Sequence, residues 1–275
     1  MSKKVIVIGA GHMGSAIVRG LLKAGSTQLR VIDPVEGRLL PWRGQGLSCS
    51  QGLTDVMPGD TLMLAMPPQA FPAFARGCPE LAGHSGVVVS VMAGVRIATI
   101  CDALQTQKVV RVIPNTPSEV LEGMSVCCRS AAVDAGESGH VLGLLQAFGD
   151  VVEVPDEALL DPATALCGGG PAFVAYFVDA MQDFALASGF DSTNARRMTL
   201  QVLRGTAALI TASGKEPSRI CREVMTPGGT TERGIACFDE YGVGPIVRQA
   251  LARTAARSSE LGGVGPTKTS EAASC

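Results

Sequence analysis

The chain has 275 residues, of which 46% are hydrophobic and 17% charged, and its formal net charge is −2 at pH 7. This length is typical of two domains or one large one, and the apolar content is sufficient for a large buried core. The near-neutral charge and the lack of a basic run argue against a nucleic-acid-binding protein, and no apolar stretch is long enough to span a membrane.

Nine cysteines are scattered along the chain without a C-x-x-C pair, and only three histidines accompany them. Metal sites need clustered ligands, and disulfide frameworks are typical of small secreted domains. No segment has the pattern of a secretory signal peptide. We therefore expect a cytoplasmic protein with free thiols and without a bound metal.

A glycine-rich turn stands close to the N-terminus. The β-favouring run Val5–Ile8 leads into Gly9, Gly11 and Gly14 at G-x-G-x-x-G spacing, and an amphipathic segment, Ser15–Lys23, follows. In a dinucleotide-binding unit the first glycine permits the sharp turn, the second lets the backbone approach a pyrophosphate, and the third lets the helix pack on the strand. A merely structural glycine turn is the alternative.

The pyrophosphate is expected on the unpaired N–H groups at the start of that helix, where the helix dipole favours an anion. The residues of this turn that we assign to the cofactor are Gly9, Gly11, His12, Met13 and Gly14.

Leu29–Asp33 is predicted to be the second strand, and its last residue lies 19 positions after Gly14. A carboxylate there can accept a hydrogen bond from the ribose 2′-hydroxyl and repel a 2′-phosphate. Alternatively, Asp33 ends the strand in a turn, and Arg38 and Arg43 nearby could still bind a phosphate. The position favours NADH without excluding NADPH.

Further apolar runs predict a mostly parallel sheet covered by helices on both faces. The predicted strands are Asp60–Met66, Gly86–Ser90, Lys108–Ile113, Met124–Cys128 and Val151–Val154, with helices between them such as Gly139–Phe148. Ligands bind beyond the carboxyl ends of such strands. The cofactor residues expected at these ends are Met66, Pro67, Ala93, Gly94, Pro114 and Asn115.

Asn115 has two interpretations. It stands between two prolines, where its side-chain amide can simply hold a turn. It could equally reach a nicotinamide or the substrate.

Beyond Pro155 the pattern becomes helical. We predict a dinucleotide-binding domain over residues 1–155, an all-helical domain over 156–263 and a disordered tail over 264–275. The helices expected in the second domain are Pro171–Ser188, Ser192–Ser213 with Ser192 or Thr193 as its cap, Pro217–Met225 and Gly244–Leu261.

These helices carry apolar residues on more than one face, and the stretch Ala163–Ala187 has few charges. A domain of about 110 residues cannot cover all these faces itself. We expect an obligate oligomer with interleaved helices, and the alternative is a compact monomeric bundle.

Two glycine-containing loops, Leu166–Pro171 and Val224–Thr231, each precede a helix. Backbone N–H groups freed there would form an anion site suited to a small carboxylate. For the second loop, helix capping by threonine with a tight Pro-Gly turn is the alternative.

In these features the chain resembles the pyrroline-5-carboxylate reductase family. The shared motifs are the N-terminal glycine turn, Ser90–Val95, Arg111–Pro117, Gly168–Phe173 and Met225–Thr231. The resemblance implies a Rossmann-type domain followed by a helical dimerisation domain, in homodimers with interleaved helices that can assemble into decamers. It also implies NAD(P)H-dependent reduction of 1-pyrroline-5-carboxylate to L-proline.

The resemblance further implies site residues. The family's imino-acid loop corresponds to Val224–Thr231, with the substrate carboxylate held by backbone amides around Gly228, Gly229, Thr230 and Thr231. The hydroxyl matching Thr231 would hydrogen-bond the ring nitrogen, which makes Thr231 the candidate catalytic residue. Met92–Gly94 and the Pro114-Asn115 turn would approach the nicotinamide.

The chain departs from the family pattern at several positions. The departures are Pro67 for lysine, His12 for asparagine, Gly169 for serine, Asp179 for glutamate and Asp33-Pro34-Val35 for an Asn-Arg-Ser type of segment. Two other functions therefore stay open: a divergent reductase of another cyclic imine, and a non-catalytic dinucleotide-binding regulator.

Overall fold

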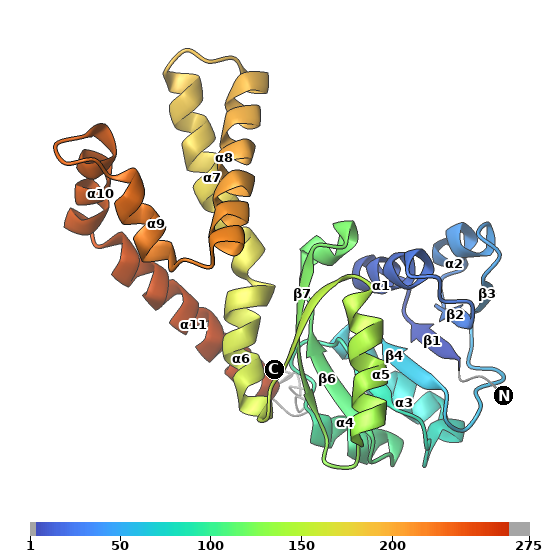
Figure 1. The fold of residues 1–275 in the computed structure, drawn as a ribbon. Helices are drawn as coiled ribbons and strands as arrows, with labels where there is room; N and C mark the ends of the chain where they lie inside the picture. Colours follow the sequence, from blue (N-terminus) through green and yellow to red (C-terminus); the bar gives the residue numbers. More distant parts are fainter. Residues whose placement is uncertain (1–3, 264–275) are drawn as a thin grey trace, which may run out of the picture. The chain divides into compact units, whose positions relative to one another are not determined.

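The computed structural model describes residues 4–263, so the predicted tail lies outside the described residues. The chain divides into two compact units. The first unit comprises the chain up to Gly169 and again from Arg253 onward, and the second unit is Gly170–Ala252 (Figure 1). The domain boundary expected at residue 155 stays a prediction. Among the described residues, no helix is both long and apolar enough to cross a bilayer.

The first unit is built on one eight-stranded sheet in the order β3-β2-β1-β4-β5-β6-β7-β8. All neighbouring strands are parallel except β6 and β7, which confirms the mostly parallel sheet. The strands are β1 (Val5–Ile8), β2 (Leu29–Ile32), β3 (Ser48–Ser50), β4 (Thr61–Leu64), β5 (Val88–Ser90), β6 (Val109–Ile113), β7 (Gly123–Arg129) and β8 (Gly149–Glu153).

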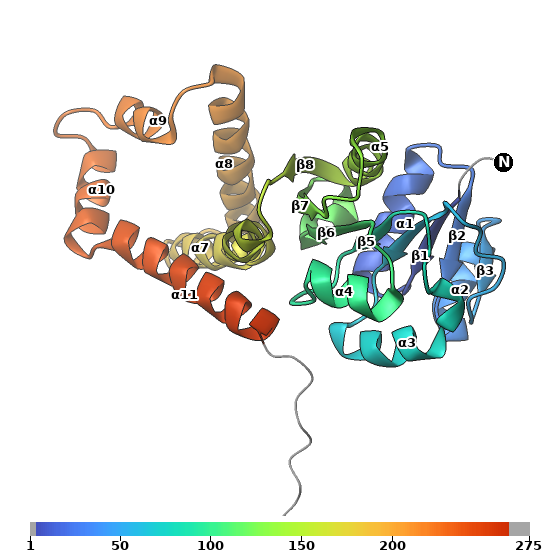
Figure 2. The same cartoon turned by 90° about the horizontal axis from the view of Figure 1, so that it is seen from below.

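Helices cover both faces of this sheet (Figure 2). Along β1, Val5 and Val7 pack against α1 (His12–Lys23), α2 (Glu36–Arg43) and α5 (Ala135–Gln146). Ile6 and Ile8 point to the other face, toward α3 (Phe71–Gly77) and α4 (Ile97–Leu104). Successive strand residues point to opposite faces, so a strand buried on both sides must be apolar throughout.

Two local predictions in this unit need correction. The edge strand Ser48–Ser50 was not expected, because three small polar residues lack the apolar signature of a strand. The first helix begins at His12 and not at Ser15, since the glycine turn itself enters the helix with Gly11 as N-cap.

The prediction that Leu166–Pro171 forms a loop is also wrong. After β8 the chain forms α6 (Leu160–Ala163), a π-helical turn over Thr164–Gly168 and α7 (Gly170–Ala187) with hardly a break. The N–H of Gly169 donates to Thr164 O at 2.8 Å. A π-turn absorbs the irregular glycine stretch, so the segment does not offer the open loop that an anion site would need.

The second unit contains α7, α8 (Ser192–Ser213), α9 (Pro217–Val224), α10 (Thr230–Glu240) and the first part of α11 (Val243–Gly263), as far as Ala252. Helices α7 and α8 pack against each other. The cap of α8 is Asp191, whose carboxylate accepts from the N–H of Asn194 at 2.9 Å. The prediction of Ser192 or Thr193 was one or two residues late.

Within Gly170–Ala252 the buried side chains are few: Ala185, Ala195, Thr199 and Ile220. Large apolar residues lie on the surface, and Tyr176 is 76% and Phe184 75% exposed. Clusters of this kind on a soluble surface mark an interaction site. The unit therefore needs another chain to cover its helices, as expected for an oligomer.

Candidate active site

The predicted cofactor residues lie along one edge of the sheet. Strands β1, β4, β5 and β6 are adjacent and parallel, so their carboxyl ends, at Ile8, Leu64, Ser90 and Ile113, share this edge. Strand order reverses at β1, which has β2 on one side and β4 on the other. A topological switch point is where open α/β sheets bind ligands.

The three glycines of the turn are required by close contacts or by an open approach. Gly9 has a φ of +105°, and a Cβ there would lie 2.7 Å from the carbonyl of Ala65, the residue after β4. A Cβ on Gly14 would lie 1.8 Å from Gly9 O, so the helix can approach the turn only with glycine. Nothing lies within 4 Å of a Cβ on Gly11. The backbone at Gly11 is therefore accessible to a ligand.

The start of α1 presents free donors beside this opening. The first helical hydrogen bond runs from the N–H of Ser15 to Gly11 O at 2.8 Å. The N–H groups of His12, Met13 and Gly14 precede it and have no intrahelical acceptor. Together with the open side of Gly11, these donors fit the pyrophosphate of a dinucleotide.

Asp33 is only 2% exposed and holds the turn in place. Its Oδ2 accepts from the N–H of Ala10 at 2.7 Å, and its Oδ1 accepts from the N–H of Val35 at 2.8 Å. The Arg38 guanidinium lies 3.5 Å from Oδ2. A carboxylate has about four lone-pair positions, so these three contacts leave one position without a partner. The ribose role stays a prediction.

Asn115 makes the contacts of a turn-holding residue. Its Oδ1 accepts from the N–H of Met124 at 2.8 Å, and its Nδ2 donates to Cys167 O at 3.2 Å. It thus ties the end of β6 to β7 and to the π-helical turn. One amide N–H remains for a ligand, so a direct contact with the nicotinamide stays a prediction.

The segment after β5 forms a bend at the same edge. Ser90 is buried, and its Oγ accepts from the N–H of Met92 at 3.3 Å. Ala93 is exposed, and Gly94 has a φ of +72°, a conformation that favours glycine. These are the backbone groups expected to approach the nicotinamide.

Two departures from the family pattern also lie near this edge. The imidazole of His12 is fully exposed, and its Nδ1 lies 3.6 Å from Glu119 Oε1 in the Thr116–Val120 turn. Pro67 is exposed and precedes the short 3-10 turn Pro68–Ala70, where it contributes no charge.

In the second unit, the loop between α9 and α10 holds a carboxylate of its own. Gly228 has a φ of +72°, and its N–H donates to Glu232 Oε2 at 2.7 Å. The N–H of Gly229 donates to Thr226 O at 2.8 Å. The N-cap of α10 is therefore Gly229 without a side-chain cap, so the threonine cap is wrong, and the contact of Glu232 with the loop was not predicted.

Thr230 and Thr231 begin α10 and are exposed, as is Val224 at the end of α9. The N–H groups of Thr230 and Thr231 lie in the first turn of α10 and have no intrahelical acceptor. The loop thus donates one N–H to a carboxylate of the same chain and presents two further N–H groups and two hydroxyls.

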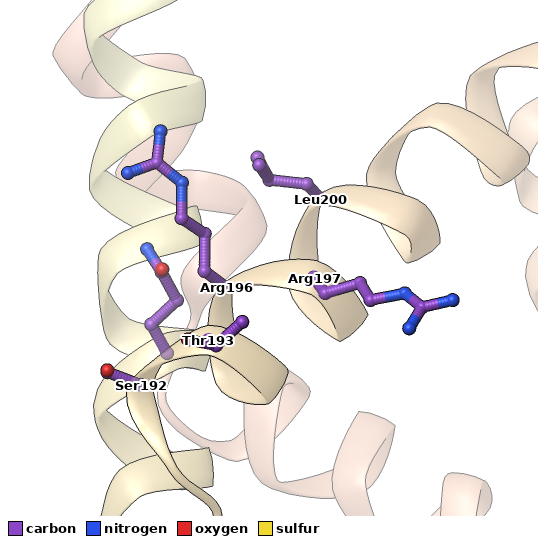
Figure 3. A pocket seen from close by; sticks show the side chains of 6 residues that line it. Ser192, Thr193, Arg196, Arg197 and Leu200 are labelled. Carbon is purple, nitrogen blue, oxygen red and sulfur yellow. The ribbon is translucent and has the colours of Figure 1, made fainter.

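A separate pocket of about 530 Å³ lies between α7 and α8 (Figure 3). The side chains of Arg196 and Arg197 point in different directions there. None of the predicted site residues lines it; the lining residues are Gln182, Ser192, Thr193, Arg196, Arg197 and Leu200.

Eight cysteines of the described chain are free thiols. Burial raises the pKa of the Cys167 thiol, and it raises the pKa of Cys127 to about 12. A thiol with a raised pKa is a poor nucleophile at neutral pH. Cys167, whose carbonyl oxygen accepts from Asn115, is thus a packing residue.

Two family profiles match the chain. The family described as pyrroline-5-carboxylate reductase dimerisation matches residues 157–261, and that described as NADP oxidoreductase, coenzyme F420-dependent, matches residues 4–94. Pyrroline-5-carboxylate reductase 3 of Macaca fascicularis is 32% identical over 265 residues, covering 94% of this chain and 96% of that protein. Pyrroline-5-carboxylate reductase of Pseudomonas aeruginosa is 32% identical, with the same two coverages.

Solved structures show the same fold. A pyrroline-5-carboxylate reductase from Coxiella burnetii has a TM-score of 0.90 at 24% identity, covering 96% of this chain and 100% of that one. The Plasmodium falciparum pyrroline carboxylate reductase with NADP bound has a TM-score of 0.83 at 22% identity, covering 95% and 100%.

Paired substitutions separate the two roles of the glycine turn. Gly14→Ala should lower the free energy of unfolding by about 1–3 kcal/mol, because its methyl group meets Gly9 O. Gly11→Ala should leave stability unchanged but raise the Kd of the dinucleotide at least about tenfold, because its methyl group enters the phosphate approach. Thermal unfolding and fluorescence titration measure the two effects. Wild-type cofactor affinity in Gly11→Ala would contradict the phosphate assignment.

Proposed function

This chain belongs to the pyrroline-5-carboxylate reductase family, and on that premise we propose how its residues bind the two reactants. It is an NAD(P)H-dependent oxidoreductase that reduces the C=N bond of 1-pyrroline-5-carboxylate to give proline. The observation that carries this function is the similarity to curated reductases over 94% of the chain. The alternatives of another imine or a lost activity are not favoured.

For the cofactor, we propose that the pyrophosphate binds the glycine turn and the first N–H groups of α1. The open side of Gly11 and the unpaired donors of His12, Met13 and Gly14 support this. Asp33 is proposed to contact the adenosine ribose. The residues proposed for the nicotinamide half are Met66, Pro67, Ala93, Gly94, Pro114 and Asn115.

For the substrate, we propose that its carboxylate binds backbone N–H groups of the Gly228–Thr231 segment, in which the N–H of Gly229 is already bonded to Thr226 O. Supporting this, the Gly228 N–H already donates to a carboxylate oxygen, that of Glu232. Val224 is proposed to contact the ring, and the Thr231 hydroxyl to hydrogen-bond the ring nitrogen. Such a set recognises a small cyclic imino acid by its charge and by one polar atom.

The chemistry asks little acid–base work of the protein. An imine nitrogen can be protonated in water before it binds, and NAD(P)H supplies the hydride when bound. A threonine hydroxyl is a poor general acid at neutral pH. Thr231 is therefore proposed to orient the ring and to hydrogen-bond the amine that forms.

We further propose a cytoplasmic homodimer with interleaved helical units that can assemble into decamers. The exposed aromatic residues of α7 support an interface that includes this helix. The free cysteines suit a reducing compartment.

Thr231→Ala should lower kcat/KM for the imine about tenfold, an effect of about 1.4 kcal/mol that matches one lost hydrogen bond. The Kd of the cofactor should not change. Thr231→Ser keeps the hydroxyl and should restore most activity. Thr211→Ala is a matched control, since this exposed threonine of α8 bonds only Ala207 O. Unchanged kinetics in Thr231→Ala would sink the assignment.

Asp33→Ser and Asp33→Asn test the cofactor preference. Both remove a charge that repels a 2′-phosphate, so the ratio of kcat/KM with NADPH to that with NADH should rise roughly tenfold. Asparagine keeps an oxygen for the N–H of Ala10 and should preserve overall nucleotide affinity better than serine does. If neither variant changes the ratio, Asp33 does not contact the ribose.

Phe184→Asp tests the interface on α7. A charge in the centre of an apolar interface is strongly unfavourable, so the variant should dissociate into smaller species in sedimentation velocity. Leu40→Asp is the control, because this residue is 59% exposed on α2 of the other unit. An unchanged sedimentation coefficient in Phe184→Asp would place the interface elsewhere.

A further inference from the structure

A buried arginine and an acid from distant parts of the chain meet close to the bend that follows β5. Arg111 on β6 has a side chain only 4% exposed, and its Nη1 donates to Glu157 Oε1 at 2.9 Å. Glu157 opens the short 3-10 turn Glu157–Leu159 that follows β8. A buried guanidinium needs a partner of opposite charge, and the Glu157 carboxylate is that partner.

The same carboxylate oxygen has a second donor. Glu157 Oε1 also accepts from the N–H of Ile97 at 2.9 Å, and Ile97 is the first residue of α4. The N-cap of this helix, Arg96, provides no side-chain cap. Glu157 thus satisfies an N–H that the helix cannot, at the end where the dipole favours a negative charge.

This contact fixes one end of the bend that follows β5. At the other end, the N–H of Val91 donates to Leu64 O at 3.0 Å. Between them, within the described chain, no hydrogen bond holds the N–H of Ala93, Gly94 or Val95. The backbone hydrogen bonds to the rest of the sheet unit therefore lie near the two ends of the bend.

The C-terminal end of α11 supports the same bend. Arg96 Nε donates to Gly262 O at 3.3 Å, and a Cβ on Gly94 would lie 3.6 Å from Leu261 O. These contacts lie within one unit of the structure. The bend is thus backed by α11 and anchored by Glu157.

We propose that Glu157, held by Arg111, is a positioning residue for hydride transfer, because it fixes the Ala93–Gly94 backbone against which the nicotinamide binds. The inference rests on the proposed cofactor site. Reacting atoms must approach to about 3–3.5 Å, and a displacement of about 1 Å can cost 100-fold in rate. A residue that anchors the bend therefore acts on the rate of hydride transfer more than on cofactor affinity.

Glu157→Ala and Glu157→Gln test this role. The alanine variant should lower kcat about tenfold or more and raise the primary isotope effect on kcat with nicotinamide deuterated at the transferred position, because hydride transfer becomes slower relative to other steps. Glutamine keeps a neutral oxygen for the Ile97 N–H and should recover part of both effects. If the alanine variant does not fold, the glutamine variant must still raise the isotope effect.

Binding to the cofactor-free protein gives a second readout. ADP-ribose and its 2′-phosphate lack the nicotinamide, and Glu157→Ala should bind whichever fragment matches the preferred cofactor as tightly as wild type does. The complete reduced dinucleotide should bind a few times more weakly. Equal weakening of fragment and dinucleotide would overturn the proposal, since it would indicate a general loss of structure.

Glu137→Ala is the matched control. Glu137 also pairs with a cation, Lys108, and accepts from a backbone N–H, that of Asp134, but it does so at the start of α5. Its loss should lower thermal stability and leave the isotope effect unchanged. An isotope effect in Glu157→Ala and Glu157→Gln that stays at the wild-type value would refute the positioning role.

Gly94→Val distinguishes failure of this inference from failure of the proposed site. If Gly94→Val weakens the dinucleotide relative to the fragment but Glu157→Ala does not, only the positioning role is wrong. If neither variant does so, the nicotinamide does not bind this bend and both proposals fall.

Discussion

The close approach of helix α1 to the turn after β1 is the constraint on which the first unit depends. The space for a Cβ on Gly14 is filled by the carbonyl of Gly9, and the space for a Cβ on Gly9 is filled by the backbone of Ala65 and Met66, directly after β4. Asp33 then fixes the turn from β2 through the N–H of Ala10. The glycine turn thereby fixes the ends of β1, β2 and β4 relative to one another, and it fixes the direction of the free N–H groups of α1. The N–H groups proposed to bind the pyrophosphate are therefore oriented by packing alone.

The features predicted from sequence are those whose signal is local. Val5–Ile8 with its glycines, and the apolar runs that became β4, β5 and β6, each specify an element within a few residues. Parallel order then brings their ends to one edge without further information. Most of the candidate cofactor residues could be located in this way. The edge strand Ser48–Ser50 could not, because its pairing and not its composition makes it a strand.

The residues that were missed make contacts across long stretches of sequence. Glu157 is 46 residues from Arg111 and 60 from Ile97, and no spacing rule links them. Leu166–Pro171 failed for another reason, because glycine-rich sequence permits a loop and a π-turn equally well. In α8, Ser192 and Thr193 were the expected caps, and the observed cap is Asp191, because an Asp, a Ser and a Thr stand in a row and only geometry selects among them.

The hydrogen bond between Glu232 and the N–H of Gly228 has a consequence for how substrate affinity should be understood. A substrate carboxylate that took this N–H would have to exchange places with a carboxylate tethered four residues away. Such an internal competitor has a high effective concentration, so the net gain on binding would be the difference between two similar contacts. Product could then leave without leaving the N–H of Gly228 unpaired, because Glu232 would take it again.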